Sequence, residues 1–215
     1  MASLFLLLAA ALPAQESGQS SHMDHRFDPA TYAKAFDNPE RDQWQKPEEV
    51  IAALDLKPGQ AVADIGAGTG YFSIRLARSK AAPAVFAVDI EPSMLDYIQK
   101  RAEQEGLRNV RTVEGGERSP NLPEPVDCVL MVNTYHHIAD RPGYFRNVGK
   151  LLKPGGRVAI IDYRKGGTMG PAREHRFTAE EITAEMAKAG YTLAARPGFL
   201  PNQEFLIYRQ GEGPK

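Results

Sequence analysis

The chain of 215 residues carries 26 Lys and Arg against 27 Asp and Glu, a formal net charge of −1. This length, with ordinary apolar and charged fractions, predicts one globular domain with a sizeable core. The balanced charge provides no general attraction to nucleic acid or to anionic membranes. Cys128 is the single cysteine and lies in the apolar run Val126–Val132. We therefore expect a buried structural thiol, and we exclude disulfides within the chain and thiolate zinc sites.

The amino-terminal stretch differs in composition from the rest of the chain. Met1–Leu12 is apolar and uncharged, is too short to span a bilayer, and precedes the polar segment Pro13–Ser21. This pattern is typical of a secretory signal, which would make residues 1–22 a signal peptide and linker, cleaved near Ala14. The mature protein would then be periplasmic or secreted. No Lys or Arg precedes the run, so a cytoplasmic protein that starts at Met23 is the alternative.

Residues 23–46 are expected to form a polar N-terminal arm with a short helix around Tyr32–Phe36. Pro47 is well placed as the first residue of a helix that runs through Leu54, because proline is favoured at the first helical position. Residues 47–210 are then expected to form the folded domain.

The stretch AVADIGAGTGY, residues 61–71, predicts a strand, a glycine turn and a helix in succession. Ala61–Ile65 is apolar except for Asp64, as expected for a strand buried on both faces. Gly66, Gly68 and Gly70 follow at alternate positions. Glycines allow a ligand to approach the backbone closely, and the next helix presents unpaired N–H groups at its amino end. This order predicts a small-ligand site.

Strands and helices alternate over the rest of the chain. Strands are expected at Ala84–Val88, Asn109–Val113, Val126–Val132 and Arg157–Asp162. Helices are expected at Pro92–Glu105, Asp140–Leu152 and from Thr178, which has capping-box spacing to Glu181, to Ala189. Tyr191–Ala195 and Glu204–Arg209 are expected to form a hairpin at one sheet edge. The alternation, without an internal repeat, predicts one α/β domain with a mainly parallel sheet.

Four segments together resemble the class I S-adenosylmethionine-dependent methyltransferases. They are ADIGAGTGY, VFAVDIEPSML, VDCVLMVNTYHHI and LLKPGGRVAIIDY, and the resemblance covers roughly Val50 to Arg209. Within that family the chain looks most like small bacterial members with HRFD…WQKPEEV and NTYHH segments. The resemblance implies a Rossmann-like, seven-stranded, mainly parallel sheet with an antiparallel last strand and helices on both faces. It also implies S-adenosylmethionine as the cofactor and a small molecule as the methyl acceptor.

The resemblance assigns cofactor contacts to matching positions. Asp64 would hold the ammonium group, and the Gly66–Gly70 turn, with Ala67, would border the methionine and ribose. Asp89 would accept hydrogen bonds from the ribose hydroxyls, and Ile90 would lie against the adenine. Asp64 and Asp89 have a structural reading as well, as acceptors that cap their own strand ends.

Two further cofactor contacts are less closely specified by the pattern. Many members have an Asp after the third strand that accepts from the adenine amino group. Here Glu117 is the candidate, with backbone groups near Gly116 as the alternative. Asn133 ends the fourth strand, so its amide could contact the methionine carboxylate of the cofactor or the acceptor, or the residue could simply form the turn.

Tyr135, His136 and His137 follow Asn133 and are the candidates for catalysis, since imidazole titrates near neutral pH. Structural packing of these side chains is the competing interpretation. Tyr32, Phe36 and Trp44 could form an aromatic lid. The loop Gly166–His175, with the basic residues beside it, could form the other wall of the acceptor site. His22 and His25 have the spacing of a metal clamp that His136 and His137 could complete, but a solvated arm is the default and no metal is predicted.

Two other functions compete with methyl transfer. A nicotinamide-dependent oxidoreductase would need G-x-G-x-x-G, and here the third glycine comes one residue early. An exported, non-catalytic binding module would explain an amino-terminal signal, since S-adenosylmethionine is made inside cells. The sequence leaves the acceptor and the oligomeric state open.

Overall fold

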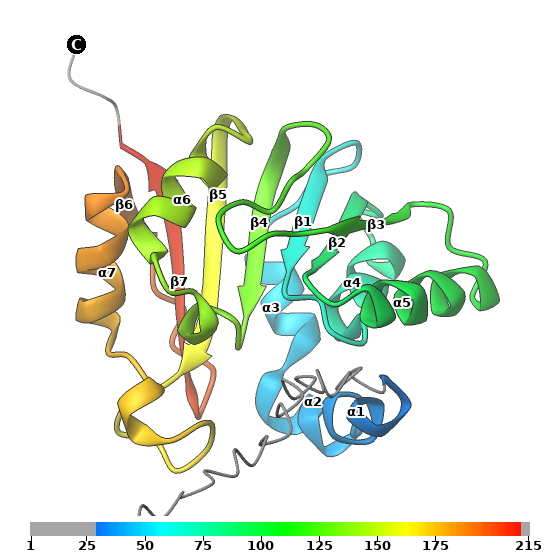
Figure 1. Cartoon of the computed structure of the whole chain (residues 1–215), viewed down its shortest axis with the longest axis horizontal. Coiled ribbons are helices and arrows are strands. Elements are labelled where there is room, and N and C mark those ends of the chain that lie inside the picture. Colours follow the sequence, from blue (N-terminus) through cyan, green and yellow to red (C-terminus); the bar gives the residue numbers. More distant parts are fainter. Residues whose placement is uncertain (1–28, 212–215) are drawn as a thin grey trace, which may run out of the picture.

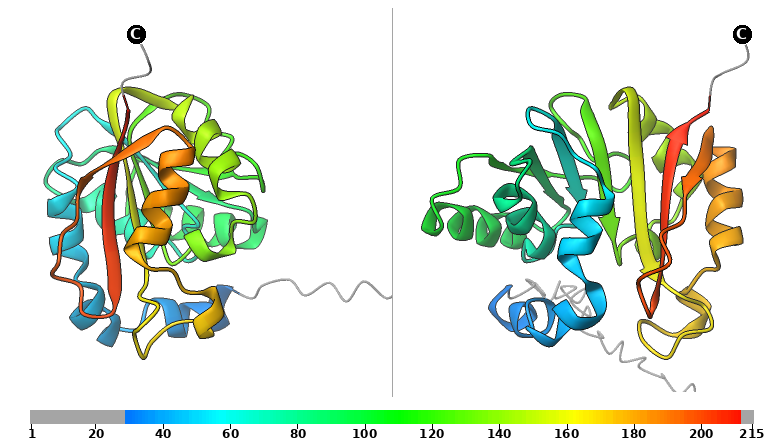
Figure 2. Two further views of the ribbon diagram at one scale, coloured as in Figure 1. Left: turned by 90° about the vertical axis from the view of Figure 1, so that its left-hand side faces the viewer. Right: turned by 180° about the vertical axis from the view of Figure 1, so that it is seen from behind.

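The computed structural model describes residues 29–211, which form a seven-stranded sheet between two layers of helices (Figures 1 and 2). The spatial order of the strands is β3-β2-β1-β4-β5-β7-β6. Within the described residues, no helix is long and apolar enough to cross a membrane. The strands are β1 (Ala61–Ile65), β2 (Ala84–Asp89), β3 (Val110–Glu114), β4 (Val126–Val132), β5 (Leu152–Tyr163), β6 (Tyr191–Ala195) and β7 (Gln203–Gln210).

The first five strands are parallel, and β7 runs antiparallel to both β5 and β6. The central strands β1 and β4 are almost entirely buried. Two-sided burial explains why they read as continuous apolar runs rather than as alternating patterns. The expected seven-stranded sheet with an antiparallel last strand is confirmed, and β6, rather than β7, is its outer edge.

The helices are α1 (Pro29–Phe36), α2 (Glu40–Gln45), α3 (Pro47–Ala53), α4 (Tyr71–Arg78), α5 (Pro92–Gln104), α6 (Arg141–Gly149) and α7 (Ala179–Lys188), with short 3₁₀ turns η1 (Tyr135–His137) and η2 (Arg173–His175). Side chains of α3, α4 and α5 pack in one core cluster with one face of the sheet, and those of α6 and α7 pack in a second cluster with the other face. Figure 2 shows α3 in blue and α7 in orange on opposite sides of the sheet. Helices on both faces are thus confirmed.

Most expected elements form within one or two residues of their expected ends, and three features differ. The helix α2 was not expected. The helix α6 ends at Gly149, three residues before the expected end. Strand β5 begins at Leu152 rather than at the expected Arg157, because Leu152 already pairs with Val126, and Pro154, Gly155 and Gly156 lie within the strand beside a register shift.

Other local expectations are confirmed. Thr178 and Glu181 form the capping box of α7 through reciprocal backbone hydrogen bonds. Cys128 is a free, fully buried thiol, and burial raises its pKa to about 12. It is therefore a packing residue rather than a nucleophile.

Candidate cofactor and acceptor site

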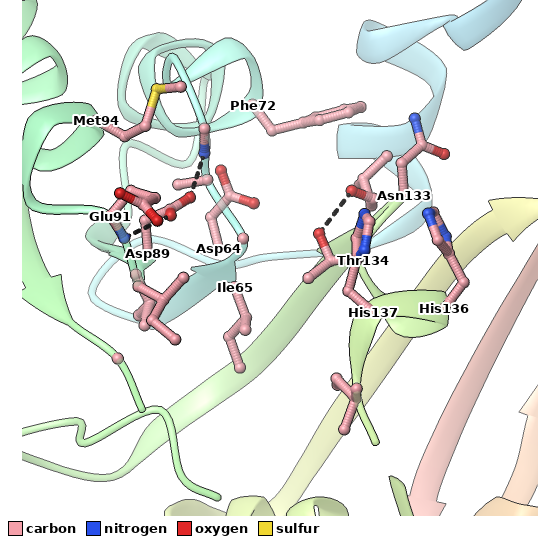
Figure 3. Close-up of a pocket in the computed structure, with 18 of the residues that line it drawn as sticks. Asp64, Ile65, Phe72, Asp89, Glu91, Met94, Asn133, Thr134, His136 and His137 are labelled. Atoms are coloured by element: carbon pink, nitrogen blue, oxygen red, sulfur yellow. Dashed lines mark hydrogen bonds between the residues drawn. The ribbon is translucent and has the colours of Figure 1, made fainter. Parts of the chain in front are cut away.

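A cavity of about 910 Å³ lies at the carboxyl ends of β1, β2 and β4. The chain leaves β1 towards β2 and β3 on one side and returns to place β4 on the other side. Open α/β sheets bind ligands at such a reversal of strand order. Figure 3 shows Asp64 from β1 between Asp89 of β2 and the segment Asn133–His137 that follows β4.

The glycine turn forms the floor of the cavity. Gly66, Gly68 and Gly70 all have left-handed backbones, with φ of 74°, 55° and 82°. The N–H groups of Gly66 and Ala67 donate to the carbonyl of Val88 at 2.8 and 2.9 Å, which ties the turn to β2. A Cβ at Gly66 would lie 2.2 Å from Thr134 Oγ1. This close approach requires glycine at the first position of the turn.

Asp89 lies at the end of β2 with both carboxylate oxygens turned to backbone donors. Its Oδ2 accepts from Gly68 N at 2.8 Å, and its Oδ1 accepts from Glu91 N at 3.0 Å (Figure 3). Each oxygen keeps a second lone pair. The carboxylate is therefore fixed in orientation and still able to accept from two ligand hydroxyls. Ile90, 55% exposed, lies beside it on the cavity wall.

Asp64 is the buried anion of the cavity, only 3% exposed. Burial raises its pKa to about 6, and the hydrogen bond that it accepts from Ser73 Oγ at 2.7 Å opposes this rise, as does the charge of Arg41. A buried carboxylate whose hydrogen bonds come only from the neutral hydroxyl and backbone N–H of Ser73 is poorly compensated. A ligand cation at this position would supply the missing charge.

Asn133 forms the turn after β4 and also lines the cavity, and its contact with a ligand stays a prediction. Its backbone is left-handed, with φ of 56°, as expected for a turn residue. Its side chain lines the cavity and is held on both sides: Oδ1 accepts from Gln203 Nε2 at 2.5 Å, and Nδ2 donates to the Tyr163 hydroxyl at 3.3 Å. Glu117 also lines the cavity, beside Gly115 and Gly116.

His136 is held by Asp162 at the other end of the cavity. Its Nδ1 lies 2.9 and 3.0 Å from the two oxygens of Asp162, which is 1% exposed and also accepts from the backbone N–H groups of His136 and Tyr163. A carboxylate can only accept, so Nδ1 carries a hydrogen, and in the neutral imidazole the lone pair then lies on Nε2. This pairing orients the ring and makes Nε2 a proton acceptor.

His137 lies beside His136, with ring centroids 4.1 Å apart, and both rings line the cavity (Figure 3). Burial lowers the pKa of His137, and the neighbouring His136 lowers it further. The neutral form is therefore favoured at neutral pH. Either imidazole can accept a proton there.

Tyr135 is the candidate that the structure removes from the site. It is fully buried between Phe145 and Phe177, its hydroxyl donates to Glu185, and it does not line the cavity. Successive residues of the 3₁₀ turn point in different directions, so the histidines face the cavity while Tyr135 faces the core. The catalytic prediction for Tyr135 is wrong on these grounds.

The loop Gly166–His175 was expected to form the other wall of the acceptor site, with basic residues facing the acceptor. The loop does reach the cavity, but three of these basic residues bond elsewhere. Arg164 donates to the carbonyls of Gln203 and Leu200, Arg176 donates to those of Pro171 and Gly167, and Lys165 pairs with Glu181. These cations hold the loop together instead of facing an acceptor. The loop contributes Gly170 and Pro171 to the cavity wall.

The expected aromatic lid is formed in part. Phe36 of α1 lines the cavity above Gly68, while Trp44 lies 6.3 Å from the ring of Tyr163, measured between ring centroids. His22 and His25 lie outside the described residues, and the metal clamp stays a hypothesis. Within residues 29–211, no group of three or more His, Cys, Asp or Glu side chains is arranged to hold a metal ion.

Comparisons with known proteins agree with this geometry. Residues 62–156 match a family model described as a methyltransferase domain. A solved S-adenosylmethionine-dependent methyltransferase from Aquifex aeolicus is 26% identical with a TM-score of 0.76, over 85% of this chain and 98% of that chain. An uncharacterised methyltransferase of Bacillus subtilis is 25% identical, over 75% of this chain and 85% of its own length. The chain belongs to the class I S-adenosylmethionine-dependent methyltransferases.

A curated relative with a named substrate is a much longer protein. Phosphoethanolamine N-methyltransferase 1 of Triticum aestivum is 31% identical over 70% of this methyltransferase, which spans only 28% of the length of that relative. The match therefore concerns one domain of a longer protein. These relatives do not favour a nicotinamide-dependent oxidoreductase.

S-adenosylmethionine is the cofactor of this family, and the cavity of this methyltransferase fits it. Asp89 is held as an acceptor for vicinal hydroxyls, and Asp64 is an undercompensated anion for an ammonium group. The glycine turn leaves the intervening backbone bare. The adenine contacts of Ile90 and Glu117, both on the cavity wall, stay predictions.

Three features of this methyltransferase were missed by the sequence analysis. Asp162 is the last residue but one of β5 and Asp89 is the last residue of β2, and this similar position was a usable signal. Gln203 and Arg41 gave none, because their contacts join segments far apart in the chain.

Proposed function

We propose that this protein transfers the methyl group of S-adenosylmethionine to a small-molecule acceptor bound beside His136 and His137. The observation that carries the proposal is one continuous cavity with the cofactor residues Asp64 and Asp89 at one end and the Asp162-held imidazole of His136 at the other. Bound S-adenosylmethionine supplies an electrophilic methyl group. The chain supplies alignment of the acceptor and a base for its proton.

In the proposed reaction, Asp162 keeps His136 oriented with Nε2 towards the cavity. Nε2 then removes the proton of the acceptor's hydroxyl or ammonium group, and Asp162 stabilises the imidazolium that forms. His137, kept neutral by burial, packs against the same ring and shapes the acceptor space. Placing the reactants within one cavity supplies the proximity on which such a displacement depends.

The acceptor class is part of the proposal. An amine or a hydroxyl compound suits an imidazole base, and phosphoethanolamine is one candidate because a relative is named for it. Nucleic acid is not proposed, since the chain carries a balanced charge.

A screen of small amines, phenols, alcohols and carboxylic acids, phosphoethanolamine included, tests this proposal through release of S-adenosylhomocysteine. With an accepted substrate, His136→Gln should lower kcat by about 10²–10⁴-fold, the range for loss of a general base. Its affinity for S-adenosylhomocysteine should stay within a few-fold of the wild type. His175→Gln is the matched control, because His175 is exposed and outside the cavity lining.

Two results would count against the proposal in different ways. Turnover at the wild-type rate in both His136→Gln and His137→Gln would rule out a histidine base but would leave the methyltransferase activity in place. Tight binding of S-adenosylhomocysteine with no turnover on any acceptor class would favour the non-catalytic binding module.

We propose two cellular locations as alternatives, since the deciding residues lie outside the described part of the chain. An exported protein would follow from cleavage near Ala14, and a cytoplasmic one from a start at Met23. Amino-terminal sequencing of the protein isolated from its host separates them. A first residue near Gln15 would support export, and Met23 would support the cytoplasmic enzyme.

A further inference from the structure

Arg41 is a cation on the cavity wall whose partners are neutral. It lies on α2, and Figure 1 shows α1 and α2 beyond the carboxyl ends of the central strands. Its Nη1 donates to the carbonyl of Phe36 at 2.7 Å, and Nε and Nη2 donate to Gln45 Oε1 at 3.4 and 3.3 Å. A guanidinium has five N–H donors, and these bonds use three of them.

Two nearby arginines, in contrast, pair with carboxylates. Arg75 binds the carboxylate of Asp42 at 2.9 Å, and Arg101 binds that of Asp37 at 3.1 Å. Among residues 29–211, no carboxylate lies within ion-pair distance of Arg41. Cations taken from water need a paired anion more than a neutral acceptor. An anion bound in the cavity would supply the charge that the described residues do not.

The position of the Arg41 side chain is fixed before any ligand arrives. Its guanidinium carbon lies 3.8 Å from the ring centroid of Tyr71, and Arg75 covers the same ring at 3.9 Å. Gln45, which accepts from Arg41, is fully buried and donates to Gln203 Oε1 at 2.6 Å. Gln203 in turn holds Asn133. A cation so braced loses little side-chain freedom when it binds an anion.

The cavity therefore offers an amino acid both charges that it needs. Asp64 presents a buried carboxylate, and the charge of Arg41 already acts on it across the cavity. We propose that Arg41 binds the carboxylate of the cofactor's amino-acid end while Asp64 takes its ammonium group, so that α2 caps the methionine. This inference rests on the proposed use of S-adenosylmethionine. It makes Arg41 a determinant of cofactor specificity.

Calorimetric titration of the full chain with two ligands tests the proposal without requiring turnover. The ligands are S-adenosylhomocysteine and its decarboxylated analogue S-adenosyl-3-thiopropylamine, which keeps the amine and lacks only the carboxylate. Arg41→Gln should weaken S-adenosylhomocysteine by about 10- to 100-fold, as for the loss of a charged hydrogen bond. It should change the affinity for the analogue by less than about 3-fold. Arg41→Lys should fall between, since it keeps the charge but loses the planar fork.

Arg75→Gln is the matched control, because it also removes a guanidinium from the Tyr71 ring but the residue is outside the cavity lining. It should leave both affinities within about 3-fold of the wild type. Thermal unfolding of the unliganded variants verifies that each is folded. If Arg41→Gln does not fold, the comparison of the two ligands is made with Arg41→Lys.

The outcomes separate this inference from the proposed function. Equal affinity of wild type and Arg41→Gln for S-adenosylhomocysteine would overturn the role of Arg41 and leave the methyltransferase intact. Equal losses on both ligands would overturn it as well, because the effect would not depend on the carboxylate. Failure of the wild type to bind S-adenosylhomocysteine would overturn the proposed function, and this inference with it.

Discussion

Gly66 lies where the end of β1 and Thr134 leave no room for a side chain. Its φ is 74°, and a Cβ there would meet three atoms of Thr134 within 2.8 Å. The left-handed backbone and the overpacking each add a penalty, together about 2–5 kcal/mol. Gly66→Ala should lower the free energy of unfolding by that amount in a denaturant titration.

Gly59 is the matched control for that substitution. Its φ is 82°, and nothing lies within 4 Å of a Cβ placed there. Gly59→Ala should therefore show only the backbone penalty, about 1–2 kcal/mol. Equal losses in the two variants would mean that Thr134 moves aside at no cost.

Asp64 shows the opposition between stability and binding within one side chain. Its folded pKa is about 6 against an ordinary value of 3.8. Below pH 4 the group is neutral in both the folded and unfolded states and has no effect. As pH rises through 4 to 6, the unfolded state ionises first, so the fold loses about 3 kcal/mol.

Asp64→Asn should therefore stabilise the unliganded protein at pH 7.5 and bring no gain at pH 4. The same substitution should weaken S-adenosylhomocysteine binding by about 10- to 100-fold at pH 7.5. Wild-type affinity should fall as pH drops below about 6, while that of the variant should stay flat over this step. Chemical denaturation and calorimetry across this pH range measure both effects. A variant that is less stable than the wild type at pH 7.5 would contradict the predicted cost of burying the ionised carboxylate.

The side-chain amides of Gln45, Gln203 and Asn133 join α2, β7 and the turn after β4. The side chains of Gln45 in α2 and Gln203 in β7 are 0% and 1% exposed, and each bond between neighbours is 2.5–2.6 Å long. Gln203→Leu would leave Gln45 and Asn133 each without one partner. Since a buried unsatisfied group costs about 1–3 kcal/mol, the expected loss is about 1–3 kcal/mol from the fully buried Gln45, and the half-buried Asn133 adds less.

The loss should also be local. Amide hydrogen exchange should rise in α1 and α2 more than in β1 and β4, because those helices lose their link to the sheet. Gln99→Leu is the control, since Gln99 is exposed and bonds only within α5. A uniform increase in exchange through the whole domain would show that these amides do not hold α1 and α2 on the sheet.

The same elements show what could be predicted from sequence. The strands β1 and β4 follow from apolar runs, and α7 follows from its capping box, because these signals are local. The helix α2 has six mostly polar residues and depends on contacts such as Gln45 to Gln203, 158 residues apart. Such pairings have no local signature. For the same reason Asp89 could be identified from its motif and Asp162 from its place near a strand end, whereas Gln203 and Arg41 could not.

Across the sheet, a polar residue near the amino end of one strand stabilises the fold, whereas one at the carboxyl end of another borders the cavity. Asp127, near the amino end of β4, accepts from Ala61 N and from Lys153, whereas Asp89, at the carboxyl end of β2, accepts from Gly68 N and Glu91 N. Both are strand aspartates with backbone donors. Only Asp89 borders the cavity.

A ligand that binds the folded state alone raises its stability by about 2.7 kcal/mol at 100 times Kd. For a chain of this size, that corresponds to a rise in Tm of roughly 5–10 °C with S-adenosylhomocysteine. Asp127→Ala and Asp89→Ala should both lower the Tm of the unliganded protein, because each removes a carboxylate that accepts from backbone N–H groups. Asp127→Ala should keep the full ligand-dependent rise, and Asp89→Ala should lose it, because the ribose hydroxyls lose their acceptor. A full rise in Asp89→Ala would place the nucleoside elsewhere in the cavity, and a rise lost in both variants would mean that the sheet, rather than Asp89, determines binding.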